Sequence, residues 1–314
     1  MKIVDLCSGT GAFSYVFEKH GHQCVFSNDM IKESKDIYEL NMKSNNTFVL
    51  DNIHNIKTEN IPSHDILCSG FPCQAFSIAG KRKGFDDERS NVFWKITDIL
   101  EFHKPKIIIL ENVKNLVSHD KGNTFKIIKD NLEKIGYHIK YNILDTCKIT
   151  NIPHHRERIY IVGFLDKSLN DAFGFNFEHV SNHKINLFLE ENINEKYYYT
   201  NKLKVYDEIK KNIVKHVNTD TIYQYRRYYV RENKNKCCPT LTANMGSGGH
   251  NVPLIKDDNG IRKLTPRECF NFQGFPETYQ LPDNLSDSKL YKLAGNAVSV
   301  PVIDKIIVNI MNIL

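Results

Sequence analysis

One apolar segment near position 70 constrains the fold of this chain more than any other. It runs Asp65-Ile-Leu-Cys-Ser-Gly-Phe-Pro-Cys-Gln-Ala-Phe-Ser77 and ends in small residues. This pattern predicts a buried parallel strand that stops at Gly70, followed by a turn over the sheet edge that contains Cys73. Open α/β sheets bind ligands at that edge, where a thiol near backbone N–H groups can become a nucleophile. Cys73 is therefore a candidate nucleophile, although a lone cysteine is more often a small core residue.

Further β-runs fit the same sheet. They lie at residues 2–6, 23–27, 47–50, 106–111, 138–144 and 158–163, and helical patterns lie at residues 13–20, 31–42, 92–103 and 123–135. Alternating strands and helices predict an α/β fold with a Rossmann-like sheet. Trp94, on the third of these helices, is expected in the core.

The turn after the first strand, Cys7-Ser-Gly9-Thr-Gly11-Ala-Phe13, leads into a helix. Rossmann-like sheets offer helix N–H groups to a ligand from such a turn, although Ser14 replaces the third glycine of the GxGxxG pattern. The next two strands end in Asp29 and Asp51, and Asp29 follows Gly9 by about 20 residues, where ribose hydroxyls are bound. These strand ends predict an adenosine pocket, with helix capping as the alternative role of Asp29.

The most apolar strand, Lys106-Ile-Ile-Ile-Leu-Glu111, ends in a carboxylate at the same predicted edge as Cys73. A partly desolvated carboxyl group is suited to proton donation, and helix capping is again the alternative. Arg156 and Arg158 precede the last strand, and strand alternation predicts that they share one side. Two guanidinium groups on one face can hold carbonyl oxygens or phosphate.

Basic residues gather in two places. A long aperiodic loop at residues 75–91 contains Lys81, Arg82, Lys83 and Arg89, and long loops in compact domains are usually functional or mobile. Residues 197–236 hold ten lysines and arginines against four acidic residues, together with eight of the fifteen tyrosines. Basic charge mixed with aromatic rings predicts a polyanion-binding surface, whereas a solvated lysine face is the better interpretation of any single residue.

Composition excludes several classes of protein. The chain has 314 residues, 41% of them hydrophobic, and no uninterrupted run of about 18 apolar residues. An acidic residue at position 5 also argues against a signal peptide, so we expect a cytosolic protein with no membrane contact. The eight cysteines form no CxxC pair and no Cys/His cluster at zinc spacing, so no metal site is expected.

The pattern of the first region ends between residues 167 and 177. The second region contains short β-runs at residues 222–231, 239–243 and 252–255, and a glycine-bearing loop at residues 244–250. Thr265 and Pro266 predict a helix start. An apolar stripe at residues 302–310 predicts a last helix that covers the first sheet. The expected domains are 1–175 for catalysis and cofactor binding, 176–263 for target recognition, and 264–314 for the return to the catalytic domain.

The order of the motifs resembles that of the bacterial DNA (cytosine-5)-methyltransferases. The matching motifs are Asp5-Leu-Cys-Ser-Gly-Thr-Gly-Ala-Phe13, Gly70-Phe-Pro-Cys-Gln74, Glu111-Asn-Val113, Arg156-Glu-Arg158, Arg262-Lys-Leu-Thr-Pro-Arg-Glu-Cys269 with Gln273-Gly-Phe-Pro276, and Gly295-Asn-Ala-Val298. They span almost the whole chain. Cys7 and Ala12 depart from the family's usual Phe and Gly, and His154 stands where a Gln commonly precedes Arg156.

The resemblance implies an S-adenosylmethionine-dependent methyltransferase sheet with a smaller, loop-rich target-recognition domain. It implies methyl transfer to C5 of a flipped-out cytosine in double-stranded DNA through a Cys73 adduct at C6, with S-adenosylhomocysteine as product. The implied catalytic residues are Cys73, Glu111, Arg156 and Arg158. The implied cofactor-binding residues are Asp5, Gly9, Gly11, Phe13, Asp29, Met30, Asp51, Asn52, Pro72, Asn296 and Ala297. The expected DNA-binding residues are Ser77, Lys81, Arg82, Arg89, Arg226, Arg227, Arg231, Thr240, Asn244 and Gly248, with phosphate contact ranked above base contact for the arginines.

The resemblance also implies a bacterial or phage enzyme that works as a monomer in the cytoplasm and has a restriction endonuclease as functional partner, without a stable complex. A first alternative is a transfer RNA cytosine as substrate, but that branch carries Cys-Phe-Thr where this chain has Cys269-Phe-Asn. A second alternative is an inactive DNA-binding regulator, against which the retained catalytic residues argue. The missing third glycine and everything after Gly70 exclude a nicotinamide oxidoreductase.

Overall fold

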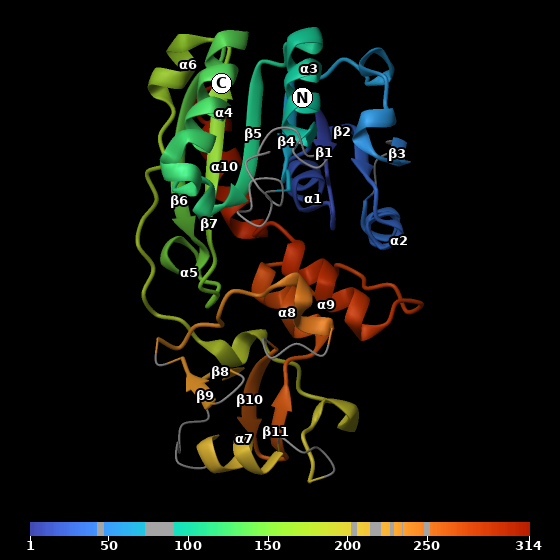
Figure 1. Cartoon of the computed structure of the whole chain (residues 1–314), viewed down its shortest axis with the longest axis vertical. Helices are drawn as coiled ribbons and strands as arrows, with labels where there is room; N and C mark the ends of the chain where they lie inside the picture. Colours follow the sequence, from blue (N-terminus) through green and yellow to red (C-terminus); the bar gives the residue numbers. More distant parts are fainter. Residues whose placement is uncertain are drawn as a thin grey trace. The chain divides into compact units, whose positions relative to one another are not determined.

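The computed structural model of the chain describes residues 1–42, 47–72, 91–201, 206–213, 221–226, 229–233, 235–247 and 252–314 (Figure 1). Cys73 lies outside these ranges, as do the predicted DNA-binding residues Ser77, Lys81, Arg82, Arg89, Arg227 and Gly248. The chain forms two compact units. The first comprises Met1–Leu144, Glu157–Phe177 and Val302–Leu314, and the second comprises Asp145–Arg156 and Glu178–Pro301.

A mixed sheet lies at the centre of the first unit. Its seven strands within the described residues are ordered β3-β2-β1-β4-β5-β7-β6 (Figure 1). Their bounds are β1 Lys2–Leu6, β2 Gln23–Asp29, β3 Thr47–Leu50, β4 Ile66–Ser69, β5 Ile107–Val113, β6 His138–Asp145 and β7 Glu157–Phe164. Strands β3, β2, β1, β4 and β5 are parallel, whereas β7 pairs with β5 in the antiparallel direction. The predicted α/β class with a Rossmann-like sheet is therefore confirmed.

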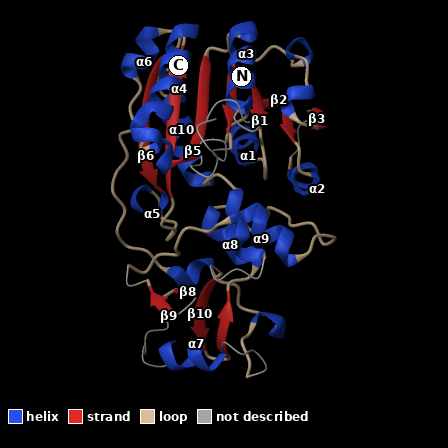
Figure 2. Cartoon of the chain, viewed as in Figure 1, coloured by secondary structure: helices blue, strands red, loops and turns tan. Residues whose placement is uncertain are grey.

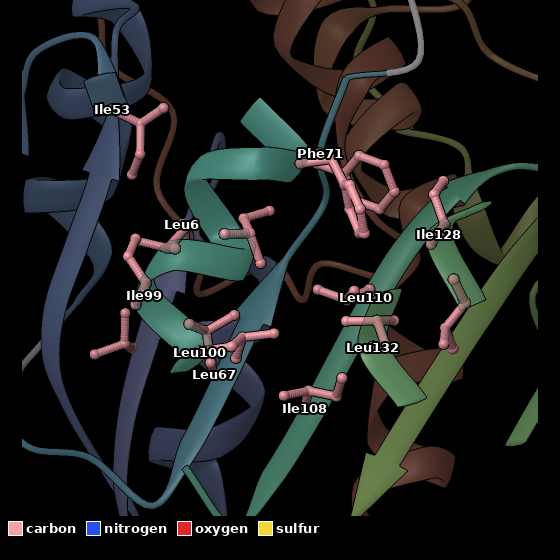
Figure 3. Packing of buried hydrophobic residues seen from close by; sticks show 14 of the residues in the cluster. Leu6, Ile53, Leu67, Phe71, Ile99, Leu100, Ile108, Leu110, Ile128 and Leu132 are labelled. Carbon is pink, nitrogen blue, oxygen red and sulfur yellow. The ribbon is translucent and has the colours of Figure 1, made fainter. Parts of the chain in front are cut away.

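Two helices cover one face of this sheet with apolar side chains. The helices of the first part of the chain are α1 Ala12–Lys19, α2 Lys32–Asn41, α3 Asn91–His103, α4 Asn123–Ile135, α5 Thr146–Ile149 and α6 Lys167–Ala172. Figure 3 shows Leu100 of α3 and Leu132 of α4 packed toward Leu67 and Leu110 of the sheet, all within one buried cluster. Burial of each such side chain contributes about 1.5–3 kcal/mol, so this face holds the strands in place. Trp94 packs against the same cluster, as predicted.

The last helix, α10 Val300–Met311, supplies a second apolar stripe. Its isoleucines Ile303 and Ile307 are fully buried, and Asp304 accepts hydrogen bonds from Lys19 at 3.2 Å and His20 at 2.9 Å in α1. By length and composition, the segment Asp287–Met311 has an 18-residue window apolar enough to cross a membrane, but 67% of that window is buried inside the protein, as in a core helix.

The second unit is built on a smaller antiparallel sheet. Its strands are β8 Tyr223–Arg226, β9 Tyr229–Glu232, β10 Pro253–Asp257 and β11 Gly260–Lys263, in the order β11-β10-β8-β9 (Figure 2). Its longer helices are α7 Tyr206–Ile213, α8 Pro266–Gln273 and α9 Asp287–Asn296. Ile209 of α7 packs against Leu254 and Ile261 in a separate small core.

The start of α8 follows the sequence prediction. The Thr265 side chain accepts a hydrogen bond from the Glu268 N–H, the Glu268 carboxylate accepts one from the Thr265 N–H, and Pro266 occupies the first turn. Such a capping box satisfies two N–H groups that the helix leaves without partners. Glu268 also holds the buried Arg262 guanidinium through two contacts of 2.8 Å, so the helix is locked to β11.

Two sequence expectations differ from the structure. The predicted strand at residues 239–243 does not form among the described residues, where the chain makes an isolated bridge from Cys238 to His154 and a 3-10 turn, Ala243–Gly246. Pro239 has no N–H, and the Leu241 N–H donates to a side chain instead of a strand partner. The compact units also divide at Phe177 and keep Glu178–Pro301 together. The expected boundaries at 175 and 263 concern roles in the reaction, and they remain predictions.

Gly163 allows β7 to lie close to its neighbours. A Cβ there would lie 2.6 Å from Ile139 Cδ1 and 2.8 Å from Ile108 Cγ1, closer than packed carbon atoms approach. We expect Gly163→Ala to lower the free energy of unfolding by about 1–3 kcal/mol, because the core must shift to admit the methyl group. Urea unfolding followed by circular dichroism would measure the change.

The matched control is Gly174→Ala, whose Cβ would meet only the exposed side chain of Asn176. That side chain can move away, so the control should lose clearly less stability than Gly163→Ala. Equal losses in the two variants would contradict the close packing inferred at Gly163.

Candidate active site

The turn after β1 is held in a conformation that suits glycine. Cys7, Gly9 and Gly11 have φ values of 53°, 55° and 70°, in the left-handed region that side chains rarely adopt. A Cβ at Gly11 would lie 2.7 Å from the Tyr38 ring, whereas a Cβ at Gly9 would meet nothing within 4 Å. Gly11 therefore permits close packing beneath the turn, and Gly9 leaves space in which a ligand can approach the backbone.

Asp29, the last residue of β2, fixes this turn. Its Oδ2 accepts a hydrogen bond from the Gly9 N–H, and its Oδ1 accepts one from the Ile31 N–H, both at 2.9 Å. Ile31 directly precedes α2, so the carboxylate both supports the helix start and lies beside the glycine turn. The side chain of Met30 is 68% exposed, which leaves an apolar surface open next to Asp29.

The end of β3 is tied to the end of β2 by Asn28. Its side-chain amide donates to the carbonyl groups of Val49 and Asp51 at 2.9 and 2.8 Å. The Asp51 carboxylate in turn accepts hydrogen bonds from the Asn52 N–H at 2.6 Å and the Asn55 side chain at 2.7 Å. The predicted cofactor residues of β2 and β3 thus lie at adjacent strand ends, where α/β sheets bind ligands.

A cavity of about 290 Å³ lies beside β3. Its lining residues are Phe26, Thr47, Val49, Asp51, Asn55, Ile56, Lys57, Asn60 and Pro62. The lining includes Asp51 but neither Gly9 nor Asp29, so this cavity is separate from the glycine turn.

Two predicted cofactor residues, Asp5 and Phe13, are covered by protein, with exposed fractions of 0% and 2%. The Asp5 carboxylate accepts hydrogen bonds from the Ser14 N–H at 3.2 Å and the Ser14 hydroxyl at 2.7 Å, which anchors the first turn of α1. Burial raises the pKa of Asp5 to about 7. Asp5 therefore holds the first turn of α1, and its predicted contact with a cofactor stays a prediction.

Asp5 makes the free energy of unfolding depend on pH. Because its pKa rises from 3.8 to about 7 on folding, its contribution is fully present below pH of about 4 and is lost as pH rises through about 7. Asp5→Asn keeps an acceptor for Ser14 and cannot ionise, so it should remove up to about 1.4 kcal/mol per pH unit of this decline. Urea unfolding of both proteins across that range would measure it, and identical pH slopes would contradict the assignment.

The strand before Cys73 is anchored to β5. Phe71 follows β4 and is 3% exposed, and its ring packs 6.0 Å from the Phe93 ring. The Asn112 side chain donates a hydrogen bond to the Phe71 carbonyl at 3.0 Å. Asn112 is the middle residue of the Glu-Asn-Val motif, and its role as an anchor was not foreseen from the sequence. The described chain thus reaches Pro72, one residue before Cys73, with its path fixed beside Glu111.

Glu111 and Arg158 form an ion pair between neighbouring strands. The distance from Arg158 Nε to Glu111 Oε1 is 3.1 Å, and the two side chains are only 14% and 10% exposed. In the antiparallel register of β5 and β7, Glu111 lies opposite Tyr160 and Val113 opposite Arg158. A charge pair with little water around it is strong, so the two side chains hold each other in place.

Arg156 binds backbone carbonyl groups within the second unit. It belongs to the second unit, is 2% exposed, and donates to three backbone carbonyl groups, namely Leu241 at 3.2 Å, Gly295 at 3.3 Å and Ala297 at 2.7 Å. Carbonyl oxygens are among the partners predicted for the two arginines, and the predicted catalytic role of Arg156 stays a prediction. Arg156 is a positioning residue for the chain around Gly295.

His154 compensates for the glutamine that the family pattern has at its position. Its ring is fully buried, Nδ1 lies 3.0 Å from the Phe272 carbonyl, and Nε2 accepts a hydrogen bond from the Leu241 N–H at 3.2 Å. These contacts require the tautomer with the proton on Nδ1. An imidazole thus makes one donor and one acceptor contact, as an amide can.

The remaining predicted site residues lie in the second unit. Asn296 is exposed at the end of α9, and the adjacent Ala297 is buried. Their predicted contact with a cofactor at the glycine turn of the first unit remains a prediction.

The described DNA-binding candidates include two exposed arginines of the small sheet. Arg231 of β9 lies opposite Gln224 of β8, and Arg226 donates to the Gln224 side chain at 3.1 Å. Residues two apart on a strand and residues paired across strands share a face, so Arg226, Arg231 and the exposed Tyr229 lie on the same side.

Two further candidates lie outside the strands. The Thr240 hydroxyl donates to the His155 carbonyl at 2.7 Å, and Asn244 is exposed, with its side chain bound by the Thr242 hydroxyl at 2.6 Å. Their roles in DNA binding remain predictions.

A mixed, mostly parallel sheet with polar strand ends, a glycine turn and a carboxylate–arginine pair fits the class of Rossmann-like methyltransferases. The family model for C-5 cytosine-specific DNA methylases matches residues 1–312. The chain is 48% identical over 317 aligned residues to the type II methyltransferase M.Bsp6I of Bacillus sp. (strain RFL6), covering 99% of this chain and 98% of that protein. It is 34% identical to the type II methyltransferase M.HhaI of Haemophilus parahaemolyticus, covering 99% and 94%.

Solved structures share the fold at lower identity. The Dnmt2 methyltransferase of S. pombe matches with a TM-score of 0.75 and 20% identity over 98% of this chain and 97% of that one. The methyltransferase EhMeth of Entamoeba histolytica matches with a TM-score of 0.76 and 22% identity over 99% and 98%. The chain belongs to the C-5 cytosine-specific DNA methylase family and is a DNA (cytosine-5)-methyltransferase.

Proposed function

We propose that this enzyme transfers a methyl group from S-adenosylmethionine to C5 of a flipped-out cytosine within a short specific sequence of double-stranded DNA, releasing S-adenosylhomocysteine. The observation that supports it most directly is the Glu111–Arg158 pair at the end of β5, where Asn112 also anchors the residues before Cys73. A nucleophile, an acid and a cation at adjoining strand ends are the groups that this reaction needs.

The chemistry explains why a thiolate is required. Cytosine C5 is a poor nucleophile, so Cys73 first adds to C6, and the electron pair of the C5–C6 double bond moves into the ring as N3 takes a proton. S-adenosylmethionine, when bound, supplies the electrophilic methyl group that C5 takes. Loss of the C5 proton to solvent, expulsion of the Cys73 thiolate and return of the N3 proton to Glu111 then restore the neutral aromatic ring.

Glu111 and Arg158 would each contact one polar atom of the cytosine. Arg158 holds the cytosine O2 and stabilises the negative charge that develops during addition. When Arg158 turns toward O2, its hold on Glu111 weakens, and the Glu111 carboxyl group can share a proton with N3. The 3.1 Å ion pair between them therefore serves as the resting arrangement.

The residues at the strand ends fit the proposed cofactor. Gly9 leaves open space over the turn, Asp29 lies directly beside it, and Met30 offers an exposed apolar side chain. Asp51 and Asn52 lie at the next strand end and would bind the adenosine. Gly11, Pro72, Asn296 and Ala297 complete the proposed set, with Asp5 and Phe13 supporting it from beneath the turn.

The target cytosine must leave the duplex, because C5 and C6 cannot be reached inside the base stack. We assign closure behind it to the loop at residues 75–91, including Ser77, Lys81, Arg82 and Arg89. The face of the small sheet with Arg226, Arg231 and Tyr229 combines positive charge with an exposed ring, which suits phosphate contact. Arg227, Thr240, Asn244 and Gly248 complete the proposed target-recognition surface.

We also propose that the enzyme works as a cytoplasmic monomer that protects host DNA from a partner restriction endonuclease, with which it forms no stable complex. The relatives named above as type II methyltransferases support this role. Sequencing of methylated plasmid would give the recognition site, and digestion of that plasmid would test protection.

Replacement of Glu111 by Gln tests the proposed acid. Gln keeps the size of the side chain but cannot supply the proton, so the methylation rate should fall by about 10²–10⁴-fold. Transfer of tritium from labelled S-adenosylmethionine to duplex DNA would measure the rate, and gel shifts would show that DNA binding is kept.

Glu157→Gln is the matched control. Like Glu111, Glu157 is a strand carboxylate paired with a cation, but it lies on β7, pairs with Lys114, and its side chain is 28% exposed. It should methylate near the parent rate. A Glu111→Gln enzyme as fast as this control would remove Glu111 from the mechanism. Label in transfer RNA but not in duplex DNA would favour the RNA substrate, and DNA binding without any transfer would favour the regulator.

Covalent addition by Cys73 predicts a trapped complex. Duplex DNA with 5-fluorocytosine at the target base should remain attached to the parent enzyme in denaturing gels, because fluorine cannot leave as a proton does. Cys73→Ser should abolish both methyl transfer and trapping. A parent complex that dissociates in detergent, or a Cys73→Ser enzyme that methylates normally, would refute the covalent route.

A further inference from the structure

The fold gathers a set of metal-ligating side chains that the sequence separates. Asp145, Cys147 and His155 offer one oxygen, one sulfur and one nitrogen that all lie within 4.8 Å of one another. Cys237, about 90 residues further along the chain, shares a hydrogen bond with the Cys147 thiol. All four residues belong to the second unit. The expectation that the cysteines form no metal site rested on their spacing in the sequence, which did not reveal this cluster.

The distances in the cluster match the size of a metal coordination sphere. Cys147 Sγ lies 3.4 Å from Asp145 Oδ1 and 4.0 Å from His155 Nδ1, and His155 Nδ1 lies 2.6 Å from Asp145 Oδ2. Ligands of a tetrahedral zinc ion, bound at about 2.0–2.3 Å, lie about 3.3–3.8 Å apart. The 3.4 Å contact lies in this range, whereas the 2.6 Å hydrogen bond must lengthen, the 4.0 Å contact must shorten and the Cys237 thiol must move toward the other three groups to admit an ion.

Backbone hydrogen bonds hold the three chain segments of the cluster together. The Cys147 N–H donates to the His154 carbonyl at 3.1 Å, and the His155 N–H donates to the Cys238 carbonyl at 2.8 Å. The Asp145 carboxylate also accepts the Arg156 N–H at 3.1 Å. The ligand positions are therefore set by the fold, which lowers the entropy cost of binding an ion.

The cluster is sheltered but can be reached. Asp145, Cys147 and Cys237 are buried, with exposed fractions of 5%, 8% and 7%, whereas the His155 side chain is 54% exposed. Because the His155 side chain is exposed, an ion can enter on that side of the cluster. The imidazole would then cover the ion, and the three buried side chains would hold it from within. Buried thiols also gain when a cation replaces their protons.

We propose that Asp145, Cys147, His155 and Cys237 bind one thiophilic divalent cation of the zinc class. On binding, the two thiols release two protons to solvent, two metal–sulfur bonds form, and neutral His155 donates its Nδ1 lone pair after its hydrogen bond to Asp145 opens. Two thiolates and one carboxylate carry three negative charges against two positive ones, and the nearby Arg156 N–H partly offsets the excess. No redox partner is needed.

Four protein ligands make a closed site, which is typical of structural metals. The ion would join the segment Asp145–Arg156 to the chain at Cys237. That segment contains Arg156, which holds the carbonyl groups of Leu241 and Gly295, and Thr240 is bound to the His155 carbonyl. The metal would therefore stabilise the segment that holds the proposed recognition residues in place, and it takes no part in methyl transfer. The metal site can thus be tested independently of the proposed function.

Metal analysis of the full-length enzyme tests the site. Protein stripped with a chelator, incubated with zinc under reducing conditions and desalted should contain one zinc per chain by mass spectrometry. Cobalt in place of zinc should give a thiolate-to-metal charge-transfer band, which reports the sulfur ligands. Zinc should also raise the melting temperature of the stripped parent, since an ion that binds only the folded state stabilises it.

Cys237→Ser and His155→Ala should each lower zinc affinity by at least about 100-fold, because loss of even an outer partner costs about 10–100-fold. His155 is exposed, so its variant should fold even if a cysteine variant does not. Cys238→Ser is the matched control, since the Cys238 thiol donates to the Pro239 carbonyl and a hydroxyl can do the same. It should bind zinc as the parent does.

Three results would overturn the proposal. They are a reduced parent without zinc above background, equal zinc binding by parent and His155→Ala, and a cobalt complex without the charge-transfer band. A parent that takes up zinc only after oxidation is reversed, with a Cys147–Cys237 disulfide in peptide maps, would still support the site, because such a bond and the metal use the same two sulfurs.

Discussion

The site depends on how strand β5 ends. At two consecutive residues this strand presents Glu111 to Arg158 of β7 and Asn112 to the carbonyl of Phe71 after β4. The first contact is an ion pair with little water around it, and the second fixes the path of the chain at Phe71, two residues before Cys73, the proposed nucleophile. A parallel neighbour on one side and an antiparallel neighbour on the other therefore bring three strand ends together.

The second unit is held by a different kind of contact. His154 is fully buried and Arg156 almost fully buried. Both form hydrogen bonds with backbone groups that are far away in the sequence: Arg156 with carbonyl groups, and His154 with an N–H group. Loss of these partners would lower the free energy of unfolding far more for a buried polar side chain than for an exposed one. Residues that look like substrate ligands in a motif can thus serve to position the backbone instead.

At the glycine turn, too, some motif residues are open to a ligand and others hold the backbone in place. Gly9 and Asp29 lie where a cofactor can approach, whereas Asp5 and Phe13 of the same motif are covered. Asp5 is buried next to the helix that it anchors, which raises its pKa to about 7. Its charge state is therefore coupled to the stability of the turn.

The sequence by itself determined the seven strands of the first sheet, helices α1 to α4 and α10, the capped start of α8 and the strand-end positions of Asp29, Asp51 and Glu111. These features follow from apolar periodicity and from side-chain chemistry within a few residues. Only the tertiary structure decided that Arg156 binds backbone carbonyls, that residues 239–243 form no strand, and that Cys147 meets Cys237. Such contacts join segments separated by up to about 140 residues, and local sequence patterns carry no signal for which distant groups will satisfy a buried donor or thiol.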